Sequence, residues 1–275
     1  MNPSSPDRYA LVGHPVDHSR SPLIHRLFAQ QTGENMTYEL IDALPEQFEV
    51  AVRGFQAAGG KGLNITVPHK ERAYHFASSA GDAARQAQAA NTLSFSSGSV
   101  LADNTDGIGL IRDLTVNLGV DLDNKKVLIL GAGGAARGIL CPLLAAGIQQ
   151  LTVANRTMSR ALKLKKLLGD YASFDICAFD ELSDISPQDI VINATSAGLR
   201  DETLPFPPSL FGPATLCYDL SYSMRDTPFV ELARSCGAGM AVQGWGMLVE
   251  QAAESFFIWR GVRPETRNIR ERVAR

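Results

Sequence analysis

Short apolar runs alternate with longer amphipathic stretches along the whole chain, and the alternation is more regular in the second half. Short runs bounded by glycine, proline or asparagine are typical of buried strands, and apolar residues spaced three or four apart are typical of helices. In the first half the pattern predicts strands near residues 9–13, 36–41, 61–67, 91–95 and 100–103. In the second half it predicts strands near residues 127–130, 151–154, 173–177, 190–194, 215–220 and 239–242.

Helical patterns fall between these strands. They cover residues 22–31, 45–58, 108–118, 134–146, 157–168, 228–236 and 247–259, and in addition one helix begins at Pro68 and a further one runs to about Ala89. Strands alternating with helices indicate an α/β protein, and the regular second half predicts a doubly wound parallel sheet of the Rossmann type. The apolar helix at 247–259 follows the last strand, so we expect it to return to the first domain. The sequence therefore predicts a discontinuous N-terminal α/β domain, 1–106 plus 244–275, completed by C-terminal helices, and a second domain at 107–243.

A glycine motif lies between a predicted strand and a predicted helix. Its residues are Gly131, Ala132, Gly133, Gly134, Ala135 and Ala136. In a Gly-x-Gly-x-x-Gly/Ala turn, the first glycine permits the tight turn and the second lets the backbone approach a pyrophosphate. The unpaired N–H groups at the helix start then face the phosphates. The strand–turn–helix context predicts a dinucleotide site.

The tip of the following strand indicates which dinucleotide binds. A unit that prefers NAD places Asp or Glu there, to bind the ribose 2′-hydroxyl. Here the tip has Asn155 and Arg156, with Arg160 one helical turn further on. A guanidinium can bind a 2′-phosphate through two hydrogen bonds, whereas a carboxylate would repel it. We predict NADP(H) as the cofactor, and we interpret the neighbouring lysines, Lys163, Lys165 and Lys166, as a solvated surface.

Composition and charge exclude several other classes of protein. The chain has 275 residues, 45% hydrophobic and 20% charged, with a net charge of −3, which gives no nucleic-acid or membrane signature. No apolar run approaches the ~20 residues of a membrane span, and no signal peptide is evident. The four scattered cysteines indicate reduced thiols, and the histidines lack metal-ligand spacing. We expect a cytoplasmic protein without metal, a monomer or homodimer that binds a small-molecule substrate.

Uncharged polar residues gather where the strands of the first domain end. They are Ser19, Ser21, Asn64, Thr66 and Asn91, and Asp106 opens a later helix. Ligands of open α/β sheets bind at the carboxyl ends of the strands. Any one of these residues could be a cap or turn residue, as Ser21 before Pro22 illustrates. Together at one edge they predict a site for a polyhydroxylated small molecule.

Lys70 and Asp106 are the charged pair of interest. Reduction of a ketone by a nicotinamide needs a proton donor at the carbonyl oxygen, and a lysine beside a carboxylate can fill that role. Lys70 lies in the first turn of a predicted helix, where the dipole lowers the pKa of a lysine, while a nearby carboxylate would raise it. From spacing alone, an exposed helix lysine and an N-capping Asp106 are favoured over a catalytic pair.

Seven ordered motifs resemble those of shikimate dehydrogenases of the AroE type. They are Gly13 to His25, Asn64 to Lys70, Asn91-Thr92 with Asp103 to Gly107, Gly131 to Arg137 with Asn155-Arg156-Thr157, Asn193 to Ser196, Asp219 to Tyr222, and Gly244 to Ala252. This family reduces 3-dehydroshikimate reversibly to shikimate with NADPH. The resemblance implies a substrate-binding, catalytic first domain and an NADP-binding Rossmann domain.

The resemblance also implies roles for individual residues. The carboxylate would be bound by Ser19, Ser21 and Tyr222, and the hydroxyls and ketone by Thr66, Lys70, Asn91, Asp106 and Gln251. The cofactor would be bound by Gly131, Ala132, Gly133, Gly134, Ala135, Asn155, Arg156, Thr157, Arg160, Thr195, Ser196, Leu220, Gly244 and Met247. A quinate-using relative and a non-catalytic NADP-binding regulator are the alternatives. Both serines favour the tighter shikimate-type pocket, and retention of Lys70 with Asp106 argues against a regulator.

Overall fold

The computed structural model describes residues 5–96, 98–169, 173–195 and 206–273. The chain divides into two compact units: unit 1 comprises Met1–Gly109 with Leu248–Arg275, and unit 2 comprises Leu110–Met247. Each unit contains a six-stranded sheet with helices against it. The predicted α/β class with two domains is confirmed.

The sheet of unit 1 is mixed and has the order β2-β1-β3-β5-β6-β4. Its strands are β1 (Asp7–Gly13), β2 (Met36–Asp42), β3 (Gly60–Ile65), β4 (Ser79–Ala80), β5 (Thr92–Ser96) and β6 (Ser99–Asp103). β1 pairs in parallel with β2 and β3, whereas β5 runs antiparallel to both β3 and β6. The amino end of β5 therefore lies at the same edge as the carboxyl ends of β3 and β6.

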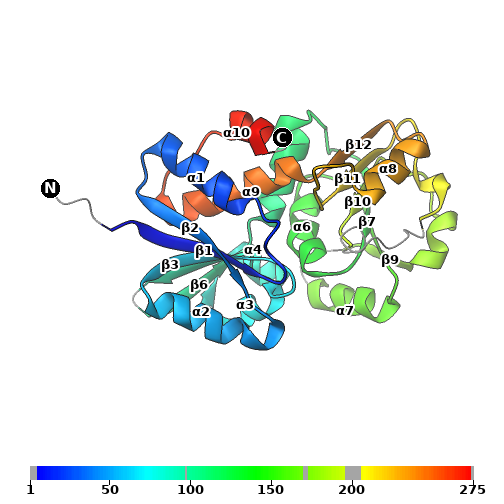
Figure 1. Cartoon of the computed structure of the whole chain (residues 1–275). Helices are drawn as coiled ribbons and strands as arrows, with labels where there is room; N and C mark the ends of the chain where they lie inside the picture. Colours follow the sequence, from blue (N-terminus) through cyan, green and yellow to red (C-terminus); the bar gives the residue numbers. More distant parts are fainter. Residues whose placement is uncertain (1–4, 97, 170–172, 196–205, 274–275) are drawn as a thin grey trace. The chain divides into compact units, whose positions relative to one another are not determined.

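Helices cover both faces of this sheet. They are α1 (Ser21–Thr32), α2 (Phe48–Ala57), α3 (Lys70–Phe76), α4 (Asp82–Ala87), α9 (Trp245–Arg260) and α10 (Arg267–Val273). Figure 1 shows α1, α9 and α10 on one face and α2 and α3 on the other. Leu63 and Ile65 face the α2 side with Phe48 and Val52, so Asn64 between them faces the α9 side. Side-chain alternation along β3 thus sends one amide toward α9.

Unit 2 has an entirely parallel sheet with the order β12-β11-β10-β7-β8-β9. Its strands are β7 (Lys126–Leu130), β8 (Gln150–Asn155), β9 (Asp175–Ala178), β10 (Ile190–Asn193), β11 (Leu216–Asp219) and β12 (Met240–Gln243). Numbered from β7, this is the 3-2-1-4-5-6 order of a dinucleotide-binding sheet. The predicted doubly wound sheet is confirmed.

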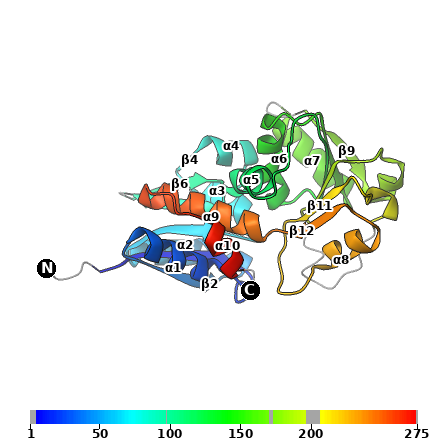
Figure 2. The ribbon, with the colours of Figure 1, turned by 90° about the horizontal axis from the view of Figure 1, so that it is seen from above.

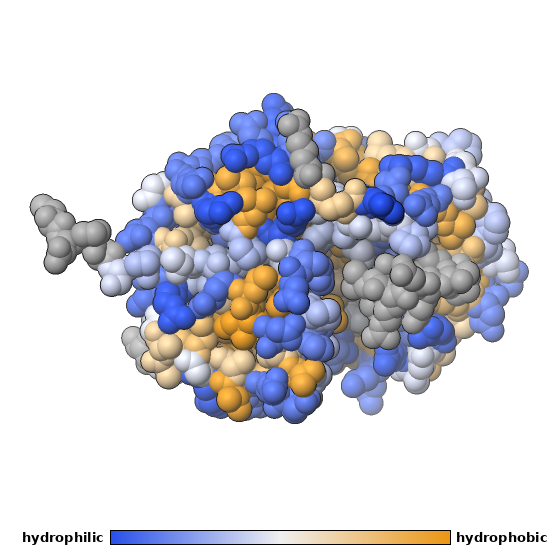
Figure 3. All heavy atoms as spheres, viewed as in Figure 1, coloured by the Kyte–Doolittle hydropathy of each residue, from blue (hydrophilic) through white to orange (hydrophobic). Residues whose placement is uncertain are grey.

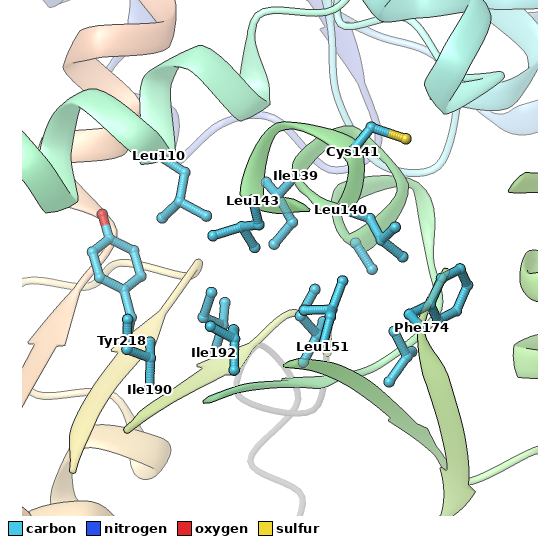
Figure 4. Packing of buried hydrophobic residues seen from close by; sticks show 14 of the residues in the cluster. Leu110, Ile139, Leu140, Cys141, Leu143, Leu151, Phe174, Ile190, Ile192 and Tyr218 are labelled. Atoms are coloured by element: carbon cyan, nitrogen blue, oxygen red, sulfur yellow. The ribbon is translucent and has the colours of Figure 1, made fainter. Parts of the chain in front are cut away.

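Unit 2 buries apolar side chains on both faces of its sheet. α5 (Asp106–Arg112), α6 (Gly134–Ala145) and α7 (Met158–Leu168) lie on one face, and α8 (Pro228–Ser235) lies on the other. Figure 4 shows Ile139 and Leu143 of α6 directed at Ile192 and Leu151 of the strands. Strands buried on both faces appear in sequence as continuous apolar runs, which is why the sequence predicted them well.

Some elements differ from the sequence prediction. β4 is only two residues long and α10 is rich in arginine, so neither has a recognisable apolar period. The helix predicted at 108–118 begins at Asp106 and continues as a π-helix over Asp113–Asn117. On the face drawn in Figure 3, hydrophobic side chains form separate areas among hydrophilic ones. No helix among the described residues is long and apolar enough to cross a membrane.

Candidate active site

Several site residues predicted from the sequence lie at one edge of the unit 1 sheet. Asn64 pairs in register with Thr92, and Thr92 pairs with Asp103, so these positions form a row across three strands. Lys70 begins α3 just beyond β3, and Asp106 begins α5 just beyond β6. The antiparallel β5 is what brings Asn91, which precedes it, to this edge.

Lys70 and Asp106 form a largely buried ion pair in the structure. The Lys70 Nζ lies 2.5 Å from the Asp106 Oδ2, and the two side chains are 14% and 5% exposed. A short charge-assisted hydrogen bond between groups shielded from water fixes both side chains in orientation. The ammonium has three N–H donors, so the bond to Asp106 leaves others available.

Asn91 donates a hydrogen bond to the other oxygen of the same carboxylate. Its Nδ2 donates to Asp106 Oδ1 at 2.9 Å and to Thr105 Oγ1 at 2.8 Å, and it lies 3.2 Å from Gln251 Oε1. Its Oδ1 accepts from the backbone N–H of Thr105 at 2.8 Å. A backbone N–H can only donate, so this bond fixes which end of the Asn91 amide faces Asp106.

Gln251 reaches the network from α9. A Cβ placed on Gly109 would lie 2.7 Å from the Cβ of Gln251 and 2.8 Å from its backbone nitrogen. Only glycine permits so close an approach of α5 and α9. The close packing brings Lys70, Asn91, Asp106 and Gln251 together in one cluster.

The two serines of the loop before α1 contact each other. Ser19 Oγ lies 3.2 Å from both the Oγ and the backbone nitrogen of Ser21, which is the first residue of α1. Ser19 also lines a surface cavity of about 460 Å³ with Arg20, Arg26 and Tyr38. Thr66 lies half-buried after β3, and its backbone N–H donates to Val12.

The glycine turn of unit 2 follows β7. Gly131 has a φ of +109°, and a Cβ there would lie 3.0 Å from the carbonyl oxygen of Ala194, so glycine is required on both counts. Gly133 is the N-cap of α6, and a Cβ there would meet no described atom within 4 Å. Gly134 and Ala135 begin the helix. An open N-terminus with unpaired N–H groups fits a pyrophosphate.

The tip of β8 is tied to this turn. Asn155 Oδ1 accepts from the Ala132 N–H at 3.1 Å, and its Nδ2 donates to the Thr157 carbonyl at 2.8 Å. Both functional groups of the Asn155 amide are therefore used within the protein. Arg156 and Arg160 are exposed, and Arg160 lies in the first turn of α7. Exposed guanidiniums beside a glycine turn fit a 2′-phosphate.

A second pair of loops in unit 2 contains further cofactor residues predicted from the sequence. Thr195 donates its hydroxyl to Asn193 Oδ1 at 2.7 Å, and the Leu220 N–H donates to the Asn193 carbonyl at 2.9 Å. A Cβ on Gly244 would lie 2.7 Å from the Leu220 carbonyl oxygen, so these residues are adjacent. The Met247 N–H donates to Tyr218 at 3.3 Å. Ser196 lies outside the described residues.

Asp219 is hydrogen-bonded to both of these loops. It is fully buried and accepts from Asn193 Nδ2 at 3.1 Å, from the Ser221 N–H at 3.0 Å and from Thr227 Oγ1 at 2.6 Å. Burial raises the pKa of Asp219 to about 6, and its hydrogen bonds offset part of that shift. Tyr222, three residues on, stacks at an angle on Trp245 with 4.6 Å between ring centroids.

Sequence reasoning assigned no role to Thr105, Ser255, Asn193 or Asp219, although all four are buried. The first three are hydrogen-bonded to site residues, and Asp219 is hydrogen-bonded to Asn193. Ser255 had a detectable signal, since it lies four residues after Gln251 and therefore on the same face of α9. Within the described parts of the chain, no group of three or more His, Cys, Asp or Glu is placed to hold a metal ion.

Comparisons with known proteins show which family has this arrangement. The model of the shikimate dehydrogenase substrate binding domain matches residues 11–93. The model described as shikimate / quinate 5-dehydrogenase matches residues 114–200. The model of the shikimate 5′-dehydrogenase C-terminal domain matches residues 244–274. The three matches follow one another in the order of the chain.

Individual relatives agree. The shikimate dehydrogenase (NADP(+)) of Alkalilimnicola ehrlichii is 53% identical over 260 residues, covering 94% of this chain and 96% of that protein. The structure of an Ael1 enzyme from Pseudomonas putida is 47% identical, covers 97% of this chain and 98% of that one, and superposes with a TM-score of 0.88. Shikimate 5-dehydrogenase from Thermus thermophilus, in complex with NADP(H) and shikimate, is 31% identical, covers 98% of each chain and has a TM-score of 0.85. The chain belongs to the shikimate dehydrogenase family.

Proposed function

We propose that the protein is an NADP-dependent shikimate dehydrogenase, which reduces 3-dehydroshikimate reversibly to shikimate. The observation on which this proposal rests most is the buried Lys70–Asp106 pair, joined by Asn91 and Gln251 in one hydrogen-bonded cluster. The cluster offers an ammonium donor beside amides that recognise hydroxyl groups. That combination suits a hydroxylated ring with a ketone.

Unit 1 supplies substrate binding and proton transfer in this proposal. Lys70 uses one N–H to hold Asp106 and presents another to the ketone oxygen, where it donates the proton. Asp106 orients the ammonium through its Oδ2. Its Oδ1 accepts a hydrogen bond from Asn91, which holds the carboxylate in place. Thr66, Asn91 and Gln251 bind the ring oxygens, and Ser19 and Ser21 bind the carboxylate.

Unit 2 supplies cofactor binding. When bound, NADPH supplies the hydride for the reduction. The backbone of Gly131 to Ala135 binds the pyrophosphate, and Arg156 and Arg160 bind the 2′-phosphate. The loops with Thr195, Leu220, Gly244 and Met247 complete the cofactor site, with Asn155 and Thr157 at the tip of β8. A Cβ placed on Gly133 would meet no described atom within 4 Å, which supports this assignment.

A steady-state assay tests the proposal. Purified protein is mixed with shikimate or quinate and with NADP or NAD, and the nicotinamide absorbance is followed. We expect the highest kcat/KM with shikimate and NADP. A higher kcat/KM with quinate would make the protein a quinate dehydrogenase, the second activity named in one matching family description.

A binding measurement separates the enzyme from a regulator. NADPH that binds, as seen by its fluorescence, while 3-dehydroshikimate causes no absorbance change would contradict the catalytic proposal. Light scattering distinguishes the monomer from the homodimer. The four cysteines are unpaired, which supports a reducing compartment such as the cytoplasm.

A further inference from the structure

We propose that Ser255 is a positioning residue, whose buried hydroxyl aligns Asn91 and, through it, the Lys70–Asp106 pair. This inference rests on the proposed function of that pair. Ser255 is fully buried on α9 and lies one helical turn beyond Gln251. It belongs to none of the groups that we assign to the substrate.

The Ser255 hydroxyl lies where four segments of unit 1 meet. Its Oγ lies 2.9 Å from Asn64 Nδ2, 2.8 Å from Thr92 Oγ1 and 3.2 Å from Thr105 Oγ1. It also lies 3.1 Å from the Gln251 carbonyl of its own helix. One serine hydroxyl thus connects α9 to β3, to β5 and to the turn before α5.

The directions of these hydrogen bonds follow from their partners. The Tyr38 hydroxyl donates to Asn64 Oδ1 at 2.8 Å, so the Nδ2 of Asn64 is the end that faces Ser255 and donates to it. Thr92 Oγ1 donates to Asn91 Oδ1 at 2.9 Å, which leaves the Thr92 oxygen to accept from Ser255. The single Ser255 proton is shared between two acceptors, Thr92 Oγ1 at 2.8 Å and the Gln251 carbonyl at 3.1 Å. When it is on the nearer one, the hydrogen bonds run in one direction, from Asn64 through Ser255 and Thr92 to Asn91.

This chain of hydrogen bonds ends at the reacting pair. Asn91 Oδ1 receives the Thr92 hydroxyl, so its Nδ2 is directed at Asp106 Oδ1. The opposite oxygen, Oδ2, holds Lys70. Loss of the Ser255 hydroxyl removes the nearest acceptor of Asn64 Nδ2 and the nearest donor of Thr92 Oγ1, inside a buried region. Asn64 Nδ2 then keeps only its longer bonds to the Asn91 carbonyl at 3.1 Å and to Thr92 Oγ1 at 3.3 Å. Thr92 then turns, and the Asn91 amide loses one of the two bonds to its Oδ1.

The first test is Ser255→Ala, a substitution that suits a helix and adds no volume. We expect kcat/KM for shikimate to fall about ten- to a hundredfold, since small misplacements near the reacting groups have effects up to that size. The KM for NADP should stay within twofold, and the pH profile of kcat should shift. Ser235→Ala is the matched control, because Ser235 is an exposed serine of α8 that bonds to Leu232 of its own helix.

A double-mutant cycle distinguishes positioning from general loosening. Thr92→Val removes the next hydroxyl in the chain, and Thr92→Ser retains it. We expect Thr92→Val to resemble Ser255→Ala, Thr92→Ser to resemble the wild type, and the double variant to lose no more than the less active single variant. If Ser255→Ala does not fold, the Thr92 pair gives the same test.

Two outcomes would overturn the proposal. One is kcat/KM within twofold of the wild type in Ser255→Ala and Thr92→Val, and the other is losses that multiply in the double variant. Inactivity of the wild type with shikimate would instead reject the proposed function.

Discussion

Asp106 in unit 1 and Asp219 in unit 2 are both buried carboxylates at the carboxyl edge of a sheet, but they have different kinds of partner. Asp106 holds the ammonium of Lys70 at 2.5 Å and the amide of Asn91 at 2.9 Å. Among the described residues, the hydrogen-bond donors to Asp219 are neutral: an amide, a backbone N–H and a hydroxyl. One carboxylate faces a cation, and the other does not.

The difference separates a reacting group from a structural one. A buried cation beside a carboxylate places a mobile proton next to a fixed negative group, which is the arrangement that acid–base chemistry needs. Three neutral donors on one carboxylate instead join three backbone segments. Through Asn193 and Ser221, Asp219 holds the loops that contain Thr195 and Leu220. Substitutions at the Lys70–Asp106 pair should therefore change activity, whereas substitutions at Asp219 should change stability.

The largest effect is expected for Lys70→Ala. Removing the ammonium takes away the proton donor while the hydroxyl-binding amides remain, so kcat should fall by about two to four orders of magnitude. The KM for shikimate should change much less. Steady-state absorbance assays measure both parameters, and Lys61→Ala, at an exposed lysine of β3, is the control. A large rise in KM with kcat intact would make Lys70 a binding residue and remove the contrast with Asp219.

The second effect concerns stability at Asp219. Because burial raises its folded-state pKa from 3.8 to about 6, the protonated form favours the folded state. That contribution is fully present below pH ~4 and is lost as pH rises through about 6, an amount of about 3 kcal/mol. Asp219→Asn does not titrate, so the free energy of unfolding of the wild type should decline relative to this variant across that window.

Urea unfolding at a series of pH values measures this decline. Asp175→Asn removes an exposed carboxylate from the same sheet and is the control for loss of charge alone. Parallel curves for wild type and Asp219→Asn between pH 4 and 6.5 would mean that the neutral donors fully compensate for burial.

The two carboxylates also show what could be predicted from the sequence. Lys70 and Asp106 were predicted as a pair because ketone reduction needs a proton donor and because their motifs resemble a known family. Asp219 was quoted within a motif, but its role was not predicted, since its partners depend on how two loops fold back over β11. A carboxylate in an apolar strand gives no local sign of what will bond to it.

The fold also combines elements that a local sequence pattern predicts with elements that tertiary contacts decide. The parallel strands of unit 2 were predicted close to their observed bounds because each is a mostly apolar run between turn residues. The π-helix at Asp113–Asn117 was not, and Asp113 within it accepts from Tyr218, which is remote in sequence. The spacing of Ser255 four residues after Gln251 placed it on the same helix face, but that spacing does not identify the amide and hydroxyls around it. Tertiary partners decide these features, and local pattern does not contain them.

The smallest effect is expected for Arg156→Ala, at an exposed site of unit 2 that sharpens the contrast with the buried pair of unit 1. A guanidinium bound to a 2′-phosphate contributes a charge-assisted hydrogen bond of roughly 1.5–3 kcal/mol, so the KM for NADP should rise about tenfold or more. NAD lacks that phosphate, and its KM should not change. Lys163→Ala, an exposed cation of α7, is the control. Equal changes for both cofactors would assign Arg156 to a part that they share, and the preference for NADP would then have to come from Arg160. Because the site is exposed, raising the salt concentration should reduce the Arg156→Ala effect, whereas the loss in Lys70→Ala should persist.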